Sequence, residues 1–154
     1  QLEKFLHNLG FSGIDIRVNE KQMNQKAENQ YLNQATPSDV AGLMKLVLEK
    51  DVLSAEHRKF LSGIMVKTST GADKIKQGLP PGVMFGHKTG SSSRTADGIK
   101  IADNDAGFVT LTNGRTYYIA VMITESKLDD RANAALAAQI SQTVYNYLTT
   151  EKTD

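Results

Sequence analysis

Two sets of polar residues in this chain have the types and the spacing of groups that do chemistry. Glu20 and Asn24 lie four residues apart, so the carboxylate and the amide could share and orient one water, with the carboxylate as general base. The second set is Lys88-Thr89-Gly90, in a segment with a strand pattern. A lysine there supplies positive charge for an anionic substrate, a hydroxyl supplies a donor, and a glycine lets an extended substrate lie alongside the strand.

Each set taken alone also has an ordinary interpretation. Glu20 and Asn24 are typical of a solvated polar loop, and a lone Lys-Thr-Gly tripeptide recurs by chance on solvated strands. On a regular strand Lys88 and Gly90 face one side and Thr89 the other, so a cleft that uses all three requires a locally twisted edge. The polar lining continues through three serines, Ser91, Ser92 and Ser93.

The composition predicts a globular chain and excludes several functions. Of 154 residues, 40% are hydrophobic and 23% are charged, which excludes a disordered or collagen-like chain. The net charge of +1 gives no electrostatic reason to expect nucleic acid or a membrane surface as partner, and no apolar run has the length of a membrane span. The chain has no cysteine, and its histidines (His7, His57 and His87) lack ligand spacing, so neither a metal nor another cofactor is predicted.

The first half of the chain is predicted to be helical around one irregular segment. Leu2, Phe5, Leu6 and Leu9 form a helical stripe, and we expect the sequence to open within a helix, as a piece of a longer domain would. Residues 11–35 show no clear period and are rich in side-chain amides; such long segments are often functional. Helices are then predicted after Thr36 and Ser54, the N-caps. Their predicted buried faces are Val40, Leu43, Met44, Val47 and Leu48, and Phe60, Leu61, Ile64 and Met65.

The second half changes to a strand pattern. A short helical turn over 72–77 precedes a strand over 83–93, and two further strands, over 106–112 and 116–124, are joined by a hairpin at Asn113-Gly114. An alanine-rich helix over 130–148 follows, with Ala134, Ala138, Ile140, Val144, Tyr145 and Leu148 available for packing. The prediction is therefore an α+β fold, with antiparallel strands packed by helices, in a single partial domain that spans residues 1–154.

The order and spacing of five short motifs resemble the second half of class A serine β-lactamases. The motifs are Glu20-Lys21-Gln22-Met23-Asn24, Ala35-Thr36-Pro37, Thr70-Gly71, Leu79-Pro80-Pro81-Gly82 and His87-Lys88-Thr89-Gly90. The resemblance runs through essentially the whole chain. It implies part of the class A β-lactamase/transpeptidase-like fold, with an omega-type catalytic loop. Residues 94–107, with Asn104-Asp105, look closest to the cephalosporinase branch of the class.

The resemblance also implies a two-step hydrolysis of the β-lactam ring through a serine acyl-enzyme. Glu20 would be the general base of deacylation, and Asn24 would help to hold its water. Lys88 would lie beside the proton network of the nucleophile and would favour the substrate carboxylate. Thr89 and Ser91 would hydrogen-bond that carboxylate, and the Ser91 backbone N–H would complete the oxyanion hole.

Two basic residues near this site have competing interpretations. Lys74 aligns with a position where some relatives carry an arginine that faces the substrate carboxylate, and a solvated surface lysine is the alternative. His87 precedes the Lys-Thr-Gly motif and could tune Lys88. A packed strand histidine is the preferred interpretation of His87.

The chain departs from the pattern of the family in three places. No serine is followed three residues later by lysine, and Ser38-Asp39 continues with valine, so S-x-x-K and S-D-N are absent. The nucleophilic serine is therefore expected on a missing N-terminal part, the one partner predicted besides the β-lactam; otherwise a monomer is expected. Val18 and Asn33 stand where many relatives carry an Arg–Asp ion pair, which predicts a different loop path and a wider cleft that tolerates bulky cephalosporins.

Two other functions remain as alternatives. A penicillin-binding transpeptidase or carboxypeptidase shares the Lys-Thr-Gly motif but would lack a placed deacylating carboxylate. A non-catalytic β-lactam-binding module would keep the cleft without a nucleophile. The resemblance implies a periplasmic or secreted location. The apolar faces at 2–9 and 43–48 also predict poor solubility of the isolated chain.

Overall fold

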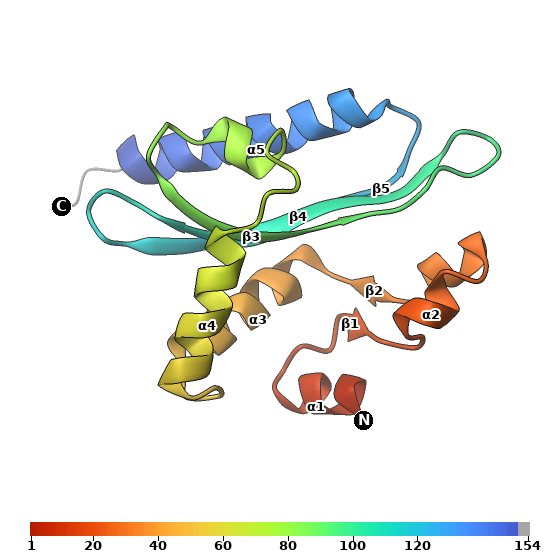
Figure 1. The fold of residues 1–154 in the computed structure, drawn as a ribbon, viewed down its shortest axis with the longest axis horizontal. Helices are drawn as coiled ribbons and strands as arrows, with labels where there is room; N and C mark the ends of the chain where they lie inside the picture. The colour runs from red at the N-terminus through yellow and green to blue at the C-terminus, as the bar shows by residue number, and fades with distance from the viewer. Residues whose placement is uncertain (151–154) are drawn as a thin grey trace.

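A three-stranded antiparallel sheet runs through the length of the molecule (Figure 1). The computed structural model describes residues 1–150. The strands are β3 (Met84–Ser91), β4 (Lys100–Thr110) and β5 (Thr116–Ser126), in the order β3-β4-β5. The hairpin predicted at Asn113-Gly114 joins β4 to β5, and Gly114 has the positive φ of 83° that such turns require. With the helices packed on the sheet, the α+β prediction is confirmed.

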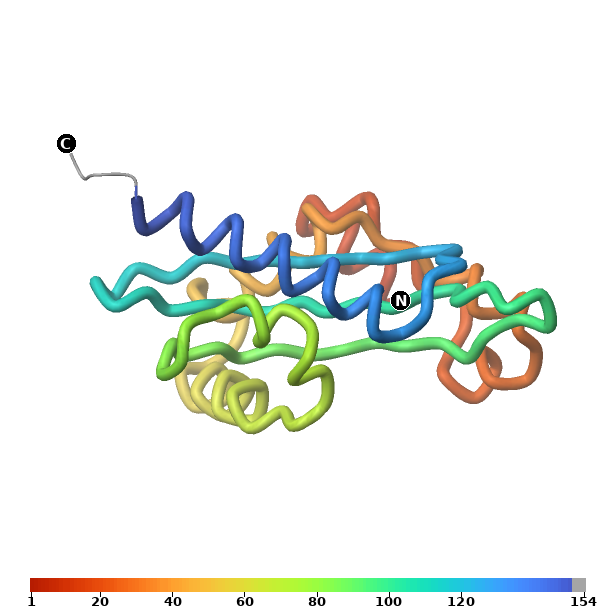
Figure 2. The backbone as a smooth tube through the Cα atoms, turned by 90° about the horizontal axis from the view of Figure 1, so that it is seen from above, coloured from red at the N-terminus to blue at the C-terminus, as the bar shows by residue number. Residues whose placement is uncertain are grey.

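The terminal helix α5 (Asp130–Thr150) lies along one face of the sheet, as Figures 1 and 2 both show. The 3-10 turn η2 (Ile75–Gly78) packs beside it, so closely that a Cβ on Gly78 would lie 2.1 Å from the Ala138 carbonyl oxygen. The main core fills the space between these two elements and the sheet. Its buried members are Ile75, Phe85, Val109, Ile119, Val121 and Ala137.

Three helices lie on the opposite side of the sheet: α1 (Leu2–Asn8), α3 (Pro37–Glu49) and α4 (Ala55–Val66). The predicted N-caps are confirmed, since Thr36 Oγ1 accepts from Asp39 N at 3.2 Å and Ser54 Oγ accepts from His57 N at 3.2 Å. None of these helices is apolar and long enough to cross a membrane, and the same holds for α5.

The buried faces predicted for α3 and α4 are only partly buried. Phe60 is 68% exposed and Ile64 is 48% exposed, so the prediction that these two side chains are buried is wrong for this chain alone. Met65, predicted on the same face, is buried. Ile64 lines an apolar groove of about 570 Å³, formed mainly by side chains of α1, α3 and α4, and residues 1–150 leave this groove open to solvent. We call it the apolar groove.

Three element boundaries or faces also differ from the predictions. β4 begins at Lys100, six residues before the predicted start at 106, because Asp103 and Asp105 are buried in the strand with polar partners. The helical turn occupies 75–78 and not 72–77. On α5, Ile140 is 39% exposed, while Ala137 and Ser141 are buried in its place.

The irregular segment contains short elements that close a loop. β1 (Ile14–Asp15) pairs antiparallel with β2 (Gln34–Ala35), and between them lie α2 (Glu20–Met23) and the 3-10 turn η1 (Ala27–Tyr31). Asp39 also ties the two ends of this loop together, because its Oδ2 accepts a hydrogen bond from Gly13 N, next to β1, at 2.7 Å. The loop lies at the end of the sheet where β3 ends and β4 begins (Figures 1 and 2).

Candidate active site

The Lys-Thr-Gly segment lies on β3, an edge strand of the sheet. β3 pairs with β4 on one side, and no strand among residues 1–150 covers its other side. Lys88 is exposed, borders the apolar groove and donates through Nζ to Thr89 O. A Cβ on Gly90 would meet nothing within 4 Å. The strand therefore presents an open backbone edge that an extended ligand can reach.

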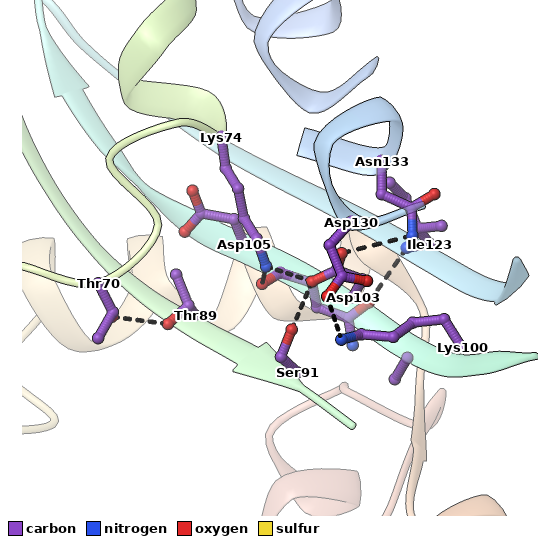
Figure 3. A network of polar contacts seen from close by, with 12 residues as sticks. Thr70, Lys74, Thr89, Ser91, Lys100, Asp103, Asp105, Ile123, Asp130 and Asn133 are labelled. Atoms are coloured by element: carbon purple, nitrogen blue, oxygen red, sulfur yellow. Dashed lines mark hydrogen bonds and ion pairs between the residues drawn. The ribbon is translucent and has the colours of Figure 1, made fainter. Parts of the chain in front are cut away.

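Thr89 and Ser91 each have a polar partner. Thr89 Oγ1 lies 2.8 Å from Thr70 Oγ1, and Ser91 Oγ donates to Asp103 Oδ1 at 2.5 Å (Figure 3). Gly71, with φ of 67°, lets the preceding loop approach, because a Cβ there would lie 2.5 Å from Thr89 Cγ2. The structure thus brings the predicted Thr70-Gly71 motif against the Lys-Thr-Gly strand.

Lys74 lies inside this network and not on the surface. It is 8% exposed, and its Nζ donates to Asp103 Oδ1 at 2.5 Å and to Asn104 O at 3.4 Å (Figure 3). The solvated-lysine interpretation is therefore wrong. Burial alone raises the pKa of the Asp103 carboxyl, but hydrogen bonds from Lys74 and Ser91 and the charges of Lys74 and Lys100 outweigh burial and hold that pKa below its usual value.

His87 is a packed strand histidine, as its preferred interpretation predicted. It is 2% exposed, stacks on Phe85 with ring centroids 4.4 Å apart, and its Nδ1 donates to Asp105 Oδ1 at 2.8 Å. Asp105 Oδ2 also accepts from Ile75 N at 3.3 Å. The pair therefore ties β3 to η2 through β4.

Sequence reasoning missed both aspartates as members of this site. Asp103 pairs with Ser91 in the β3–β4 register, and Asp105 pairs with Thr89. The available signal was the spacing of two carboxylates by two residues, which places them on one face of a strand. Each buried carboxylate then requires a polar partner, and Lys74 and His87 are those partners.

Glu20 and Asn24 lie on one turn of the loop between β1 and β2. Asn19 caps α2 through a capping box with Gln22, so Glu20 is the first residue of the helix. Asn24 N donates to Glu20 O at 3.0 Å, and residues four apart share a helix face. Glu20 is exposed, which leaves its carboxylate accessible to a substrate and a water.

Asn33 closes the loop with its side-chain amide. Its Oδ1 accepts from Arg17 N at 2.9 Å and from Val18 N at 3.1 Å, and its Nδ2 donates to Val18 O at 2.9 Å. The Arg–Asp ion pair is absent, as the sequence predicts, but an amide-to-backbone clamp holds the same two positions together. A pocket of about 380 Å³ separates the loop from β4 and β5; the wider cleft expected from the missing ion pair stays a prediction.

No cluster of three or more His, Asp or Glu side chains within residues 1–150 could hold a metal ion. The chemistry available to the described site is thus that of an exposed carboxylate beside an amide, and of a cationic and hydroxyl-bearing strand edge. The first group can deprotonate a water, and the second can bind an anionic ligand. No serine of this sequence is followed three residues later by a lysine, so the sequence contains no S-x-x-K nucleophile.

Comparison with known proteins gives consistent matches over nearly the whole chain. A family model described as the β-lactamase enzyme family matches residues 1–148. A curated β-lactamase of Bacteroides uniformis is 42% identical over 146 residues, which are 94% of this chain and 49% of that protein. The Pseudomonas aeruginosa β-lactamase VEB-1 is 35% identical, over 95% of this chain and 49% of its own length.

Solved structures match the fold as closely. A class A β-lactamase from Bacteroides cellulosilyticus superposes with a TM-score of 0.92 at 43% identity, covering 97% of this chain and 54% of that one. The TLA-3 extended-spectrum β-lactamase gives a TM-score of 0.93 at 35% identity, covering 97% and 54%. The chain spans about half the length of the curated relatives it matches.

Proposed function

The chain belongs to the β-lactamase enzyme family, class A, and from that membership we propose that it supplies the deacylating base and the substrate-binding strand of a β-lactam hydrolase. The nucleophilic serine is assigned to a segment outside these 154 residues. Two observations support that assignment: the sequence has no S-x-x-K motif, and the chain spans about half the length of its relatives. Residues 1–154 then form one partial domain of the complete enzyme.

In the proposed reaction the serine hydroxyl loses its proton while its oxygen attacks the lactam carbonyl carbon, the ring C–N bond breaks, the ring nitrogen takes up a proton, and an acyl-enzyme ester forms. The Glu20 carboxylate then takes a proton from a water held with Asn24. The water oxygen attacks the ester carbonyl, and the serine oxygen leaves and regains a proton. Lys88, Thr89 and Ser91 bind the substrate carboxylate, and the Ser91 N–H donates to the oxyanion.

The observation that carries the proposal is the geometry of the loop. Glu20 and Asn24 lie on one helical turn, in a loop whose ends are tied by Asn33 and by the β1–β2 pair. A penicillin-binding transpeptidase must preserve its acyl-enzyme from water and has no use for such a carboxylate. A binding module without chemistry has no use for a general base either.

We further propose cephalosporins as preferred substrates and a location outside the cytoplasm. The neutral Asn33 clamp in place of an ion pair, and the pocket of about 380 Å³ beside the loop, support room for bulky side chains. Two similar proteins, PER-1 and TLA-3, are named extended-spectrum β-lactamases, which supports a site that accepts varied substrates. The location is proposed because β-lactams act on cell-wall synthesis.

The test is turnover of a chromogenic cephalosporin by this chain alone, by the complete gene product, and by two variants of the latter. Glu20→Gln removes the proposed base, and Glu28→Gln is the matched control, an exposed glutamate on η1 in the same loop. We expect no turnover by the chain alone. For Glu20→Gln we expect one acylation equivalent by mass spectrometry followed by a stall, while Glu28→Gln behaves as the parent.

The alternatives predict different results. If the parent protein binds covalently and deacylates slowly whether or not Glu20 is present, the transpeptidase interpretation replaces the proposal. If it binds the drug without forming any covalent adduct, it is a binding module.

A further inference from the structure

Ser91, which is assigned to the substrate carboxylate, and Lys74, a further candidate for it, are already engaged by a carboxylate of the protein. Asp103 Oδ1 accepts from both Lys74 Nζ and Ser91 Oγ, each at 2.5 Å (Figure 3). Both groups are donors that could otherwise bind a substrate carboxylate. Charge-assisted hydrogen bonds are among the stronger hydrogen bonds in proteins.

Asp103 is fixed in this position from several sides. Its side chain is 3% exposed. Asn133 Nδ2, on α5, donates to its other oxygen at 3.4 Å, and the β3–β4 register places Asp103 directly opposite Ser91. Because Asp103 sits on a central strand that pairs on both sides, it has little freedom to withdraw when a ligand arrives.

We propose that Asp103 is a specificity-determining residue that competes with the substrate carboxylate for Lys74 and Ser91. This inference rests on the proposed function, because it concerns the same binding strand. A carboxylate-bearing substrate must draw the Ser91 hydroxyl away from Asp103, and it experiences the negative charge of Asp103 behind that hydroxyl. Lys74 offers little net attraction, because Asp103 neutralises it.

The proposal predicts a difference between charged and neutral forms of one substrate. A cephalosporin free acid competes with Asp103, whereas its methyl ester carries no charge at that position and does not. Removing the charge of Asp103 should therefore strengthen binding of the acid and leave binding of the ester unchanged. The charge of Lys74 then lacks its internal counterion and can attract the substrate.

The experiment compares the KM of a cephalosporin acid and of its methyl ester for the complete protein and for Asp103→Asn. We expect the KM of the acid to fall about ten-fold, as for removal of one buried charge near the substrate carboxylate, and the KM of the ester to stay within about two-fold. The matched control is Asp130→Asn, which removes a carboxylate paired with Arg94 and Lys100 on the same side of the sheet. It should change neither KM, because Asp130 contacts no proposed substrate-binding donor.

Asp103→Ser serves as a second variant with the same loss of charge and a smaller side chain, in case Asn at this position prevents folding; thermal unfolding identifies the folded variants. An unchanged or raised KM for the acid in a folded variant, or an equal fall for acid and ester, would overturn the proposal. If the parent protein hydrolyses neither compound, the proposed function fails. The role of Asp103 is then decided by dissociation constants of acid and ester from calorimetry, which require no turnover.

Discussion

The side chain of Asn33 hydrogen-bonds to the backbone on the other side of the loop that carries Glu20, and its replacement tests how much these bonds stabilise the loop. Asn33→Ala removes three hydrogen bonds to the backbone of Arg17 and Val18. A typical hydrogen bond contributes about 1 kcal/mol net to stability. One of the three is solvent-exposed and two share a single acceptor atom, so the expected loss in local stability is about 2 kcal/mol.

Amide hydrogen exchange measures this loss directly. A local opening made easier by about 2 kcal/mol speeds exchange of the Val18 amide roughly thirty-fold, since each 1.4 kcal/mol is a factor of ten. Deacylation by the complete protein should slow as well, because the loop holds Glu20 less firmly against its water. The Ala substitution leaves β3 and its contacts intact, so the KM of the substrate should change less than kcat.

Asn29→Ala is the control for this test. Asn29 lies in the same loop, and its side chain makes one hydrogen bond, from Nδ2 to Gln22 O at 2.7 Å. Its removal should leave exchange at Val18 unchanged. If Asn33→Ala also leaves the Arg17 and Val18 amides protected, the clamp does not hold the loop, and the pairing of β1 with β2 is sufficient.

Three further predictions follow from the fold. The pKa of Asp103 in the folded protein lies below the ordinary value of 3.8, so the ionised carboxylate stabilises the fold at pH values above 3.8. This contribution is lost as the pH falls toward the folded pKa. Asp103→Asn should therefore make the free energy of unfolding depend less on pH in the acid range. Gly78→Ala should cost about 3 kcal/mol in thermal unfolding, because its Cβ would overlap the Ala138 carbonyl oxygen, whereas Gly90→Ala should leave Tm unchanged and raise KM at the open strand edge. Burial raises the pKa of Tyr117 to about 12, and its hydroxyl has no hydrogen-bond partner within residues 1–150. Tyr117→Phe should therefore keep or raise Tm, and it should remove one phenol that ionises near pH 12 from the ultraviolet titration. A clear fall in Tm would contradict this.

Local signals in the sequence were sufficient for most elements. The caps at Thr36 and Ser54 and the Asn113-Gly114 turn depend on neighbouring residues only, and the structure has all three. The early start of β4 was missed because Asp103 and Asp105 interrupt its apolar pattern. Their partners, Lys74 and His87, are 29 and 18 residues away, and no local pattern connects residues at that distance.

For the candidate site, too, the sequence predicts local features but not contacts between residues far apart in the chain. The motifs identify Glu20, Asn24 and the Lys-Thr-Gly strand as candidates, but residue types alone do not reveal which donors are free. Ser91 and Lys74 are both engaged by Asp103, a fact that depends on the register of β3 and β4. The exposure of Phe60 and Ile64 was missed for another reason, since helical periodicity identifies an apolar face without identifying what covers it.

The placement of the core has a consequence for the order of folding. All buried members of the main core lie between Ile75 and Ala137, in a continuous stretch whose strands are joined by near neighbours in sequence. Residues 1–66 contribute few buried side chains, chiefly Leu6, Ile14 and Met65. We therefore expect the sheet and α5 to form first as a nucleus with short loop closures, and α1, α3 and α4 to be ordered afterwards on that template.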